Sequence, residues 1–257
     1  MALLILKLTL TPLLIAVATL AARRWGPAVG GWVAGLPLTS GPVSVFLALE
    51  QGPHFAARAA GGTLLGLGAV AAFCLTYARS ANGSTWRRPA AAGLGAYGIV
   101  TWGVSLPSLP LLGATVAALL FLGMALGAFP HPRARTVDTP APWWDLPVRM
   151  ATATGMVLFI TAAARVLGPK WSGLLSPFPV FACVMAIFTH RHAGAEGARR
   201  LLRGVLVGSF AFASFFVAVG LLLTRLPVAV VYIVATGVAL TVNAISLVGL
   251  LRPGAAG

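Results

Sequence analysis

Nine long runs of apolar residues follow one another along this 257-residue chain, and they constrain its fold more than any other feature. The runs cover residues 3–22, 28–50, 57–78, 89–106, 110–129, 147–167, 171–190, 201–224 and 227–251. Most approach the ~20 residues that an α-helix needs to cross a bilayer. Because lipid offers the backbone no hydrogen-bond partners, helices are the form that such runs take in a membrane. We therefore predict an all-α membrane protein with nine transmembrane helices.

The composition supports a lipid environment for most of the chain and excludes other classes of protein. Only 9% of the residues are charged, against about 25% in a typical soluble domain. A net charge of +14 would indicate nucleic-acid binding in a soluble protein, but here the basic residues cluster at the ends of the apolar runs, where they act as topology signals. We expect no nucleic-acid partner. Cys74 and Cys183 lie inside apolar runs without metal-ligand spacing, so we expect small buried side chains there.

The basic residues also predict the orientation. With nine spans, thirteen of the eighteen Lys and Arg residues fall on one side. Joining the fourth and fifth runs into one span would split them eight against ten, which is no bias. The positive-inside rule then places the N-terminus outside and the C-terminus in the cytoplasm.

Two runs contain prolines that must interrupt a helix, because proline lacks a backbone donor and clashes with the preceding turn. The first break reads GLPLTSGP at residues 35–42, and the second reads SPFP at residues 176–179. Paired broken helices in corresponding halves are typical of transporter sites. The candidate substrate-binding residues at the breaks are Pro37, Thr39, Ser40, Gly41, Pro42, Ser176, Pro177 and Pro179.

An internal repeat relates the two breaks. Shifting the chain by 142 positions superimposes Gly52 on Gly194 and Arg58 on Arg200, and about a third of positions from 19 to 73 match. Residues 1–106 then form one four-helix repeat and residues 147–257 a second, joined by a connector helix and loop at 107–146. Five crossings separate equivalent helices, so the repeats are inverted in a 4+1+4 arrangement, with broken helices 2 and 7.

The segment GLLSPFPVFA at residues 173–182, followed by Gly194, Glu196 and Arg199 and by Leu226 and Pro227, resembles the GlpM family of small bacterial inner-membrane proteins. The first half departs from this pattern, with GLPLTSGPVSVF in place of SPFPVF. The resemblance implies a four-helix unit with a proline-broken second helix, present here as a fused inverted duplication, and a location in the bacterial inner membrane. It implies no substrate.

Further polar residues inside the spans are candidates for lining the site. Asn243 is costly to bury without a partner. Two pairs have i,i+4 spacing, so each pair shares a helix face, and a gap in the register would make the pairs equivalent in the repeat; the alternative for their hydroxyls is local backbone bonding. The pairs are Tyr97/Thr101 and Tyr232/Thr236. Glu50, the acid attached to a broken helix, is the candidate for proton coupling, with an interfacial acid as the alternative.

Other charged segments have simpler interpretations. His190, Arg191 and His192 are interpreted as cytoplasmic anchoring, and Trp143 and Trp144, which stand beside Asp145, as an interfacial belt. The chain has no HExxH, GxSxG or Walker motif, so we expect no enzyme, no metal and no cofactor.

Together these patterns predict a secondary transporter or facilitator for a small anionic solute or an anionic lipid headgroup. The substrate would lie at the midplane, where each resumed helix offers a positive N-terminus. A channel, a lipid-phosphate flippase and a non-transporting structural protein remain alternatives. The expected partners are the bilayer and the substrate, and homo-oligomerisation is left open.

Overall fold

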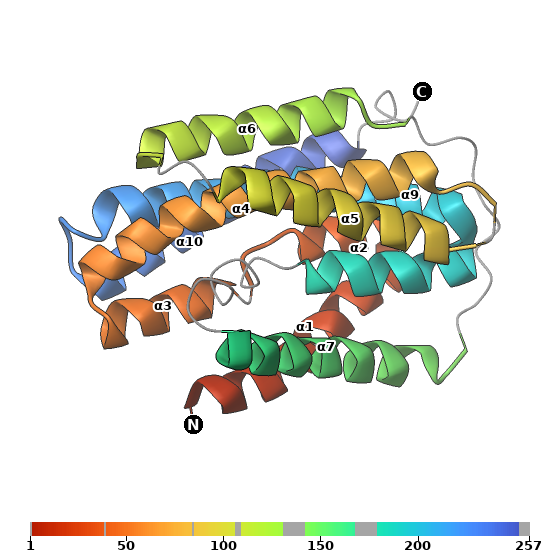
Figure 1. Cartoon of the computed structure of the whole chain (residues 1–257), viewed down its shortest axis with the longest axis horizontal. Coiled ribbons are helices and arrows are strands. Elements are labelled where there is room, and N and C mark those ends of the chain that lie inside the picture. Colours follow the sequence, from red (N-terminus) through yellow and green to blue (C-terminus); the bar gives the residue numbers. More distant parts are fainter. Residues whose placement is uncertain are drawn as a thin grey trace.

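A computed structural model describes residues 2–38, 40–83, 85–105, 109–130, 142–167 and 179–251, and all regular elements among these residues are helices. Most of the helices lie side by side along the long axis of the molecule (Figure 1). They are α1 (Ala2–Trp25), α2 (Pro27–Ala34), α3 (Ser40–Glu50), α4 (Pro53–Ser80), α5 (Arg87–Val104), α6 (Leu111–Gly127), α7 (Asp145–Leu167), α9 (Val180–Leu222) and α10 (Val228–Leu251).

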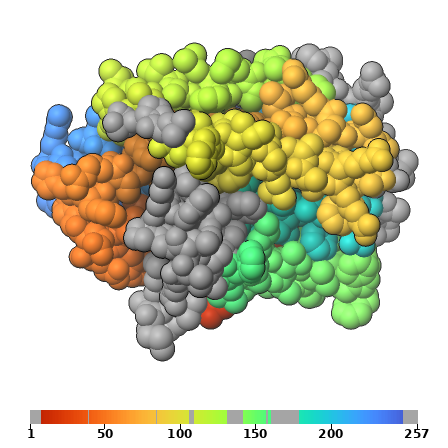
Figure 2. All heavy atoms as spheres, viewed as in Figure 1, coloured from red at the N-terminus to blue at the C-terminus, as the bar shows by residue number. Residues whose placement is uncertain are grey.

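Three of these helices contain segments long and apolar enough to cross a membrane, namely Pro53–Ser80, Val180–Leu222 and Val228–Leu247. Two shorter apolar helices, Ser40–Glu50 and Leu111–Gly127, accompany them. Large apolar side chains also point outward, among them Ile99 on α5 and Leu112 on α6. Both helices pack against α4, and both are visible on the face that Figure 2 shows. The all-helical prediction is confirmed, and the chain has the helices of a membrane protein.

The first predicted break is present. α2 ends at Ala34 and α3 begins at Ser40, so the apolar run at 28–50 is two helices and not one. Pro37 interrupts the run because it has no N–H for the helix ladder. At the second break only Pro179 is among the described residues, and it stands immediately before α9; Thr39, Ser176 and Pro177 lie outside them.

The sequence predicts a connection between the seventh and eighth runs, from residue 190 to residue 201. α9 consists of two helices that meet at a kink at Gly194, whose φ of 68° and ψ of −174° are not helical. The change from one helix to the next is therefore present, but the connection is shorter than predicted, because the residues on both sides of Gly194 are helical. Alanine, glutamate and arginine are good helix formers, which explains why the polar stretch after Gly194 is helical. Gly52, between α3 and α4, also has a positive φ, of 89°.

The centre of the bundle is a glycine contact between α2 and α9. A Cβ atom on Gly31 would collide with the carbonyl oxygen of Leu201, and one on Gly204 would collide with that of Ala28. Glycine therefore lets the two backbones touch, as small-xxx-small pairs do in membrane helices. The glycines at this contact are Gly31, Gly35, Gly204 and Gly208.

Two basic residues bind the helix ends at one end of the bundle. Arg79, near the end of α4, donates to the carbonyl oxygen of Ala128 just after α6. Arg199 of α9 donates to the carbonyl oxygens of Ala78 and Ala81, where α4 ends. These residues belong to the thirteen that the sequence assigns to one side, and the structure brings their helix ends together.

Candidate functional site

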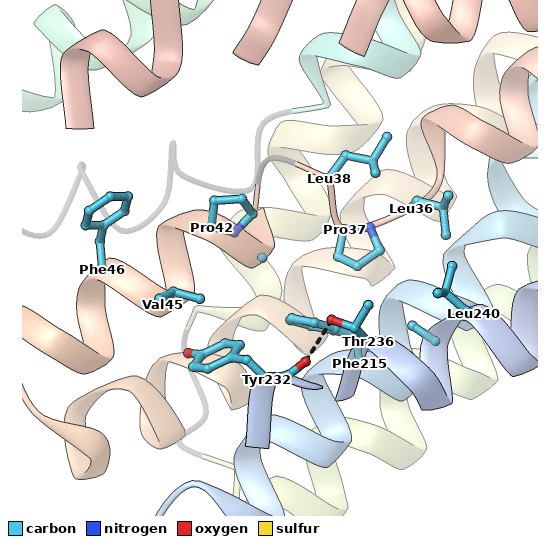
Figure 3. Close-up of a pocket in the computed structure, with 12 residues that line it drawn as sticks. Leu36, Pro37, Leu38, Pro42, Val45, Phe46, Phe215, Tyr232, Thr236 and Leu240 are labelled. Carbon is cyan, nitrogen blue, oxygen red and sulfur yellow. Dashed lines mark hydrogen bonds between the residues drawn. The ribbon is translucent and has the colours of Figure 1, made fainter. Parts of the chain in front are cut away.

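A pocket of about 430 Å³ opens at the break between α2 and α3. Leu36, Pro37 and Pro42 from the break face Thr236 and other residues of α10 across it (Figure 3). Among the residues that the structure describes, the lining is almost entirely apolar and contains no charged side chain. The residues are Leu36, Pro37, Leu38, Gly41, Pro42, Val45, Phe46, Phe215, Tyr232, Thr236, Ala239 and Leu240.

The pocket joins two features that the sequence predicts separately. Pro37, Gly41 and Pro42 of the first break meet Tyr232 and Thr236, which are an i,i+4 pair on α10. The interruption of the helix leaves the space between Ala34 and Ser40, and α10 closes its opposite wall.

Hydrogen bonds fix the hydroxyls beside the pocket. The Tyr232 hydroxyl lies 2.7 Å from the Ser44 hydroxyl of α3, within hydrogen-bond distance. The Thr236 hydroxyl donates to the carbonyl oxygen of Tyr232 at 2.7 Å, which is the local backbone bond that the sequence left open as an alternative. Sequence reasoning did not identify Ser44 as a residue beside the pocket. Its position in the same broken run as Pro37 was the one feature of the sequence that could have indicated it.

The start of α3 offers fewer backbone donors than the sequence argument assumed. The Gly41 N–H donates to the carbonyl oxygen of Pro37 at 2.8 Å, and Pro42 has no N–H. Ser40 begins the helix but does not line the pocket. An anion here would therefore meet a helix N-terminus whose donors are partly used.

Other predicted site residues lie away from this pocket. Tyr97 and Thr101 are buried on α5, and Asn243 is buried on α10, where its Oδ1 has no hydrogen-bond partner among the described residues. Glu50 is exposed at the end of α3. The pocket lining includes none of these four residues.

The repeat register at α5 and α10 also differs from the prediction. α5 begins at Arg87 and α10 at Val228, 141 residues apart, which is within one residue of the repeat offset of 142. A shift of 142 places Thr101 on Asn243 and not on Thr236. The predicted equivalence of the Tyr97/Thr101 and Tyr232/Thr236 pairs therefore has no support from the helix bounds.

A buried ionic cluster, missed by sequence reasoning, lies around Asp145. One carboxylate oxygen accepts hydrogen bonds from Arg23 of α1 and Arg149 of α7, both at 2.9 Å, and the other lies 2.9 Å from His192 Nε2 of α9. The Asp145 side chain is 0% exposed. We call these four residues the Asp145 cluster. Sequence reasoning noted Asp145 only as the neighbour of Trp143 and Trp144 and did not predict its burial; its i,i+4 spacing to Arg149 was the available signal.

The charge of Asp145 depends on these partners. Burial alone would raise the pKa of this carboxyl group, but Arg149 and Arg23 outweigh it and hold the pKa below its usual value. Asp145 precedes the apolar run at 147–167, so it lies at the end of the predicted span. A carboxylate with a lowered pKa stabilises the fold above its unfolded pKa, and this contribution is lost as the pH falls through the folded value.

We therefore expect acid to remove the stabilisation that Asp145 contributes. At neutral pH, Asp145→Asn should melt well below the parent protein, because Arg149 then lacks its buried counterion. As the pH falls below about 4, the two melting temperatures should approach each other, since protonation then begins to neutralise the parent carboxylate. Melting curves of the two proteins in detergent between pH 7 and pH 3 measure this. A difference that stays constant over the whole range would contradict it.

A second polar cluster links α4 and α9. The His190 side chain is 1% exposed, with Nδ1 lying 3.2 Å from the Tyr77 hydroxyl and Nε2 lying 3.1 Å from the carbonyl oxygen of Gly83. The sequence treats His190 as a cytoplasmic anchor, whereas the structure makes it a buried bridge between two helices. Bonds across helices depend on packing, which explains why the local HRH pattern did not reveal it.

No family model, curated protein or solved structure matches this chain. The resemblance to the GlpM family therefore remains an expectation. Arguments about function rest on the pocket at the helix break and on the two polar clusters.

Proposed function

We propose that this chain is a membrane transporter or facilitator whose substrate binds in the pocket at the break between α2 and α3. The observation that carries the proposal is the coincidence of a cavity with a discontinuous helix. Non-helical backbone at membrane depth is tolerated where protein or a cavity satisfies its polar groups, and transporters place their sites at such breaks.

The proposal includes nine spans in a 4+1+4 inverted repeat, with the N-terminus outside and the C-terminus in the cytoplasm of a bacterium. Support comes from Gly52 and Gly194, which have positive φ angles and lie 142 residues apart, as the repeat requires. The starts of α5 and α10 agree with this offset to within one residue. In such a repeat a second site element would lie at Pro179.

We further propose an organic anion with an apolar portion as the substrate. The apolar lining of the pocket favours a ligand that carries hydrocarbon. The nearby N-terminus of α3 favours negative charge on the same ligand. This combination narrows the predicted class from small anions in general to amphipathic sulfonates, carboxylates and phosphates, lipids included.

Thermal-shift measurements on the purified protein test this proposal with matched probes. Octanesulfonate should raise the melting temperature, methanesulfonate should have little effect for lack of hydrocarbon, and octyltrimethylammonium should have none because of its charge. A ligand present at 100 times its dissociation constant stabilises by about 2.7 kcal/mol. In proteoliposomes, the parent protein should also take up octanesulfonate.

Gly41→Leu provides the pocket-filling variant. A Cβ atom at Gly41 would lie 3.4 Å from Phe215 Cζ, so the backbone tolerates a side chain there while leucine occupies the cavity. This variant should fold yet lose both the thermal shift and the uptake. Gly237→Leu, on a part of α10 with no neighbour within 4 Å, is the control and should keep both. An unchanged response in Gly41→Leu would exclude the pocket as the site, and stabilisation by octyltrimethylammonium alone would exclude an anion.

A further inference from the structure

The Asp145 cluster joins three helices through one carboxylate. Arg23 lies near the end of α1, Asp145 and Arg149 lie in the first turns of α7, and His192 lies on α9, two residues before the bend at Gly194. Asp145 is within 2.9 Å of all three basic partners. A single acidic side chain therefore determines whether these helix ends stay together.

A packed layer lies directly beneath the cluster. Met185 of α9 has 0% exposure. Its sulfur accepts a hydrogen bond from Thr19 of α1 at 3.4 Å and another from Arg149 of α7 at 3.7 Å. The Arg149 guanidinium also stands over the Phe188 ring, 5.2 Å from its centroid. The seam between α1, α7 and α9 is consequently closed at this level.

The seam and the pocket occupy opposite ends of the bundle. The pocket uses the first half of α10, from Tyr232 to Leu240. Ser246 lies beyond Leu240, about 9 Å further along α10 at 1.5 Å per residue, and accepts a hydrogen bond from Trp32 of α2. Since α2 follows directly after the basic end of α1, Arg23 belongs to the far end. α3 and the start of α7 accordingly lie toward opposite ends in Figure 1.

We infer that the Asp145 cluster is an ionic clasp. It holds the ends of α1, α7 and α9 together at one end of the protein, and it must open before the substrate-binding pocket becomes accessible from that end. The inference rests on the proposed transport function, in which the two ends open in turn. An ionic contact suits a two-state gate, because separating the helices returns Asp145 and its partners to water together. The bend at Gly194 lets the first part of α9 move as a unit, since glycine tolerates the positive φ found there.

The clasp can be tested by cysteine accessibility without knowing the substrate. In a background of Cys74→Ala and Cys183→Ala, Met185→Cys places a thiol beneath the cluster. A polar maleimide should label this thiol slowly in otherwise unchanged protein. Adding Asp145→Asn should accelerate labelling at least about tenfold, because Arg149 loses its buried counterion and the seam opens.

Glu196→Gln is the matched control. Glu196 is also buried and paired, but its ion-pair partner Arg199 lies on the same helix, three residues away. This control should leave labelling of the Met185→Cys thiol unchanged. Equal labelling with and without Asp145→Asn would overturn the clasp, and an equal acceleration by Glu196→Gln would overturn it by showing general loosening.

His192→Gln covers the case in which Asp145→Asn cannot be purified. It removes one partner and leaves both arginines, so it should fold and accelerate labelling by a smaller factor in the same direction. No acceleration in His192→Gln would then reject the clasp. Accelerated labelling in a protein that neither binds nor transports octanesulfonate would retain the gate-like seam and reject the proposed transport function.

Discussion

Gly204→Leu should prevent the bundle from assembling. A Cβ atom at Gly204 would collide with the carbonyl oxygen of Ala28 and stand 2.9 Å from the backbone nitrogen of Trp32. Backbone atoms cannot rotate away as a flexible side chain can, so α2 would have to leave α9. We expect a loss of stability beyond the ~3 kcal/mol that marks the upper end of ordinary overpacking.

Size-exclusion chromatography of the detergent-solubilised protein provides the measurement. The folded, monodisperse peak should disappear for Gly204→Leu and remain for Gly123→Leu. Gly123 lies on α6 with no neighbour within 4 Å, so the same substitution there meets open space. A Gly204→Leu protein that elutes and melts like the parent would show that α2 and α9 do not touch through their backbones.

The fold was predictable from sequence where local chemistry decides it. The apolar runs require helices in any membrane, and Pro37 interrupts its run because of its own missing donor. Neither argument needs a distant residue. The length of the connection between residues 190 and 201 was harder to predict, since a polar stretch of good helix formers is compatible with either a loop or a helix, and the structure reduces the connection to a kink at Gly194.

The candidate site was predictable only in part. Pro37, Gly41 and Pro42 were identified by the break, and Tyr232 and Thr236 by their shared helix face, yet only the packing of α10 against α3 joins them.

The Asp145 cluster was beyond sequence reasoning for a similar cause. Arg23 is 122 residues from Asp145, and nothing local indicates which basic residue will meet the acid. Burial then converts an ordinary carboxylate at a helix start into the link between three helices.

Arg199 provides the second large expected effect, because one guanidinium there satisfies groups from two helices. Nε donates to the carbonyl oxygen of Ala78 at 3.1 Å, Nη2 donates to that of Ala81 at 2.7 Å, and Nη1 donates to Glu196 at 3.2 Å. The last carbonyls of a helix have no partners of their own in the helix, so Arg199 completes the end of α4.

We expect Arg199→Gln to lower the stability by about 3 kcal/mol or more, since it leaves Glu196 and the carbonyl oxygens without their cationic donor. Arg199→Lys should fall between the parent and Arg199→Gln, because an ammonium group cannot reproduce the planar fork of donors. Melting temperatures in detergent measure both effects, with Arg225→Gln as the control. Arg225 is exposed just after α9, so its replacement should shift the melting temperature little. If Arg199→Gln melts together with Arg225→Gln, then the contact between Arg199 and the end of α4 contributes nothing to stability, and the joining of α4 to α9 must depend on apolar packing and the His190 bridge alone.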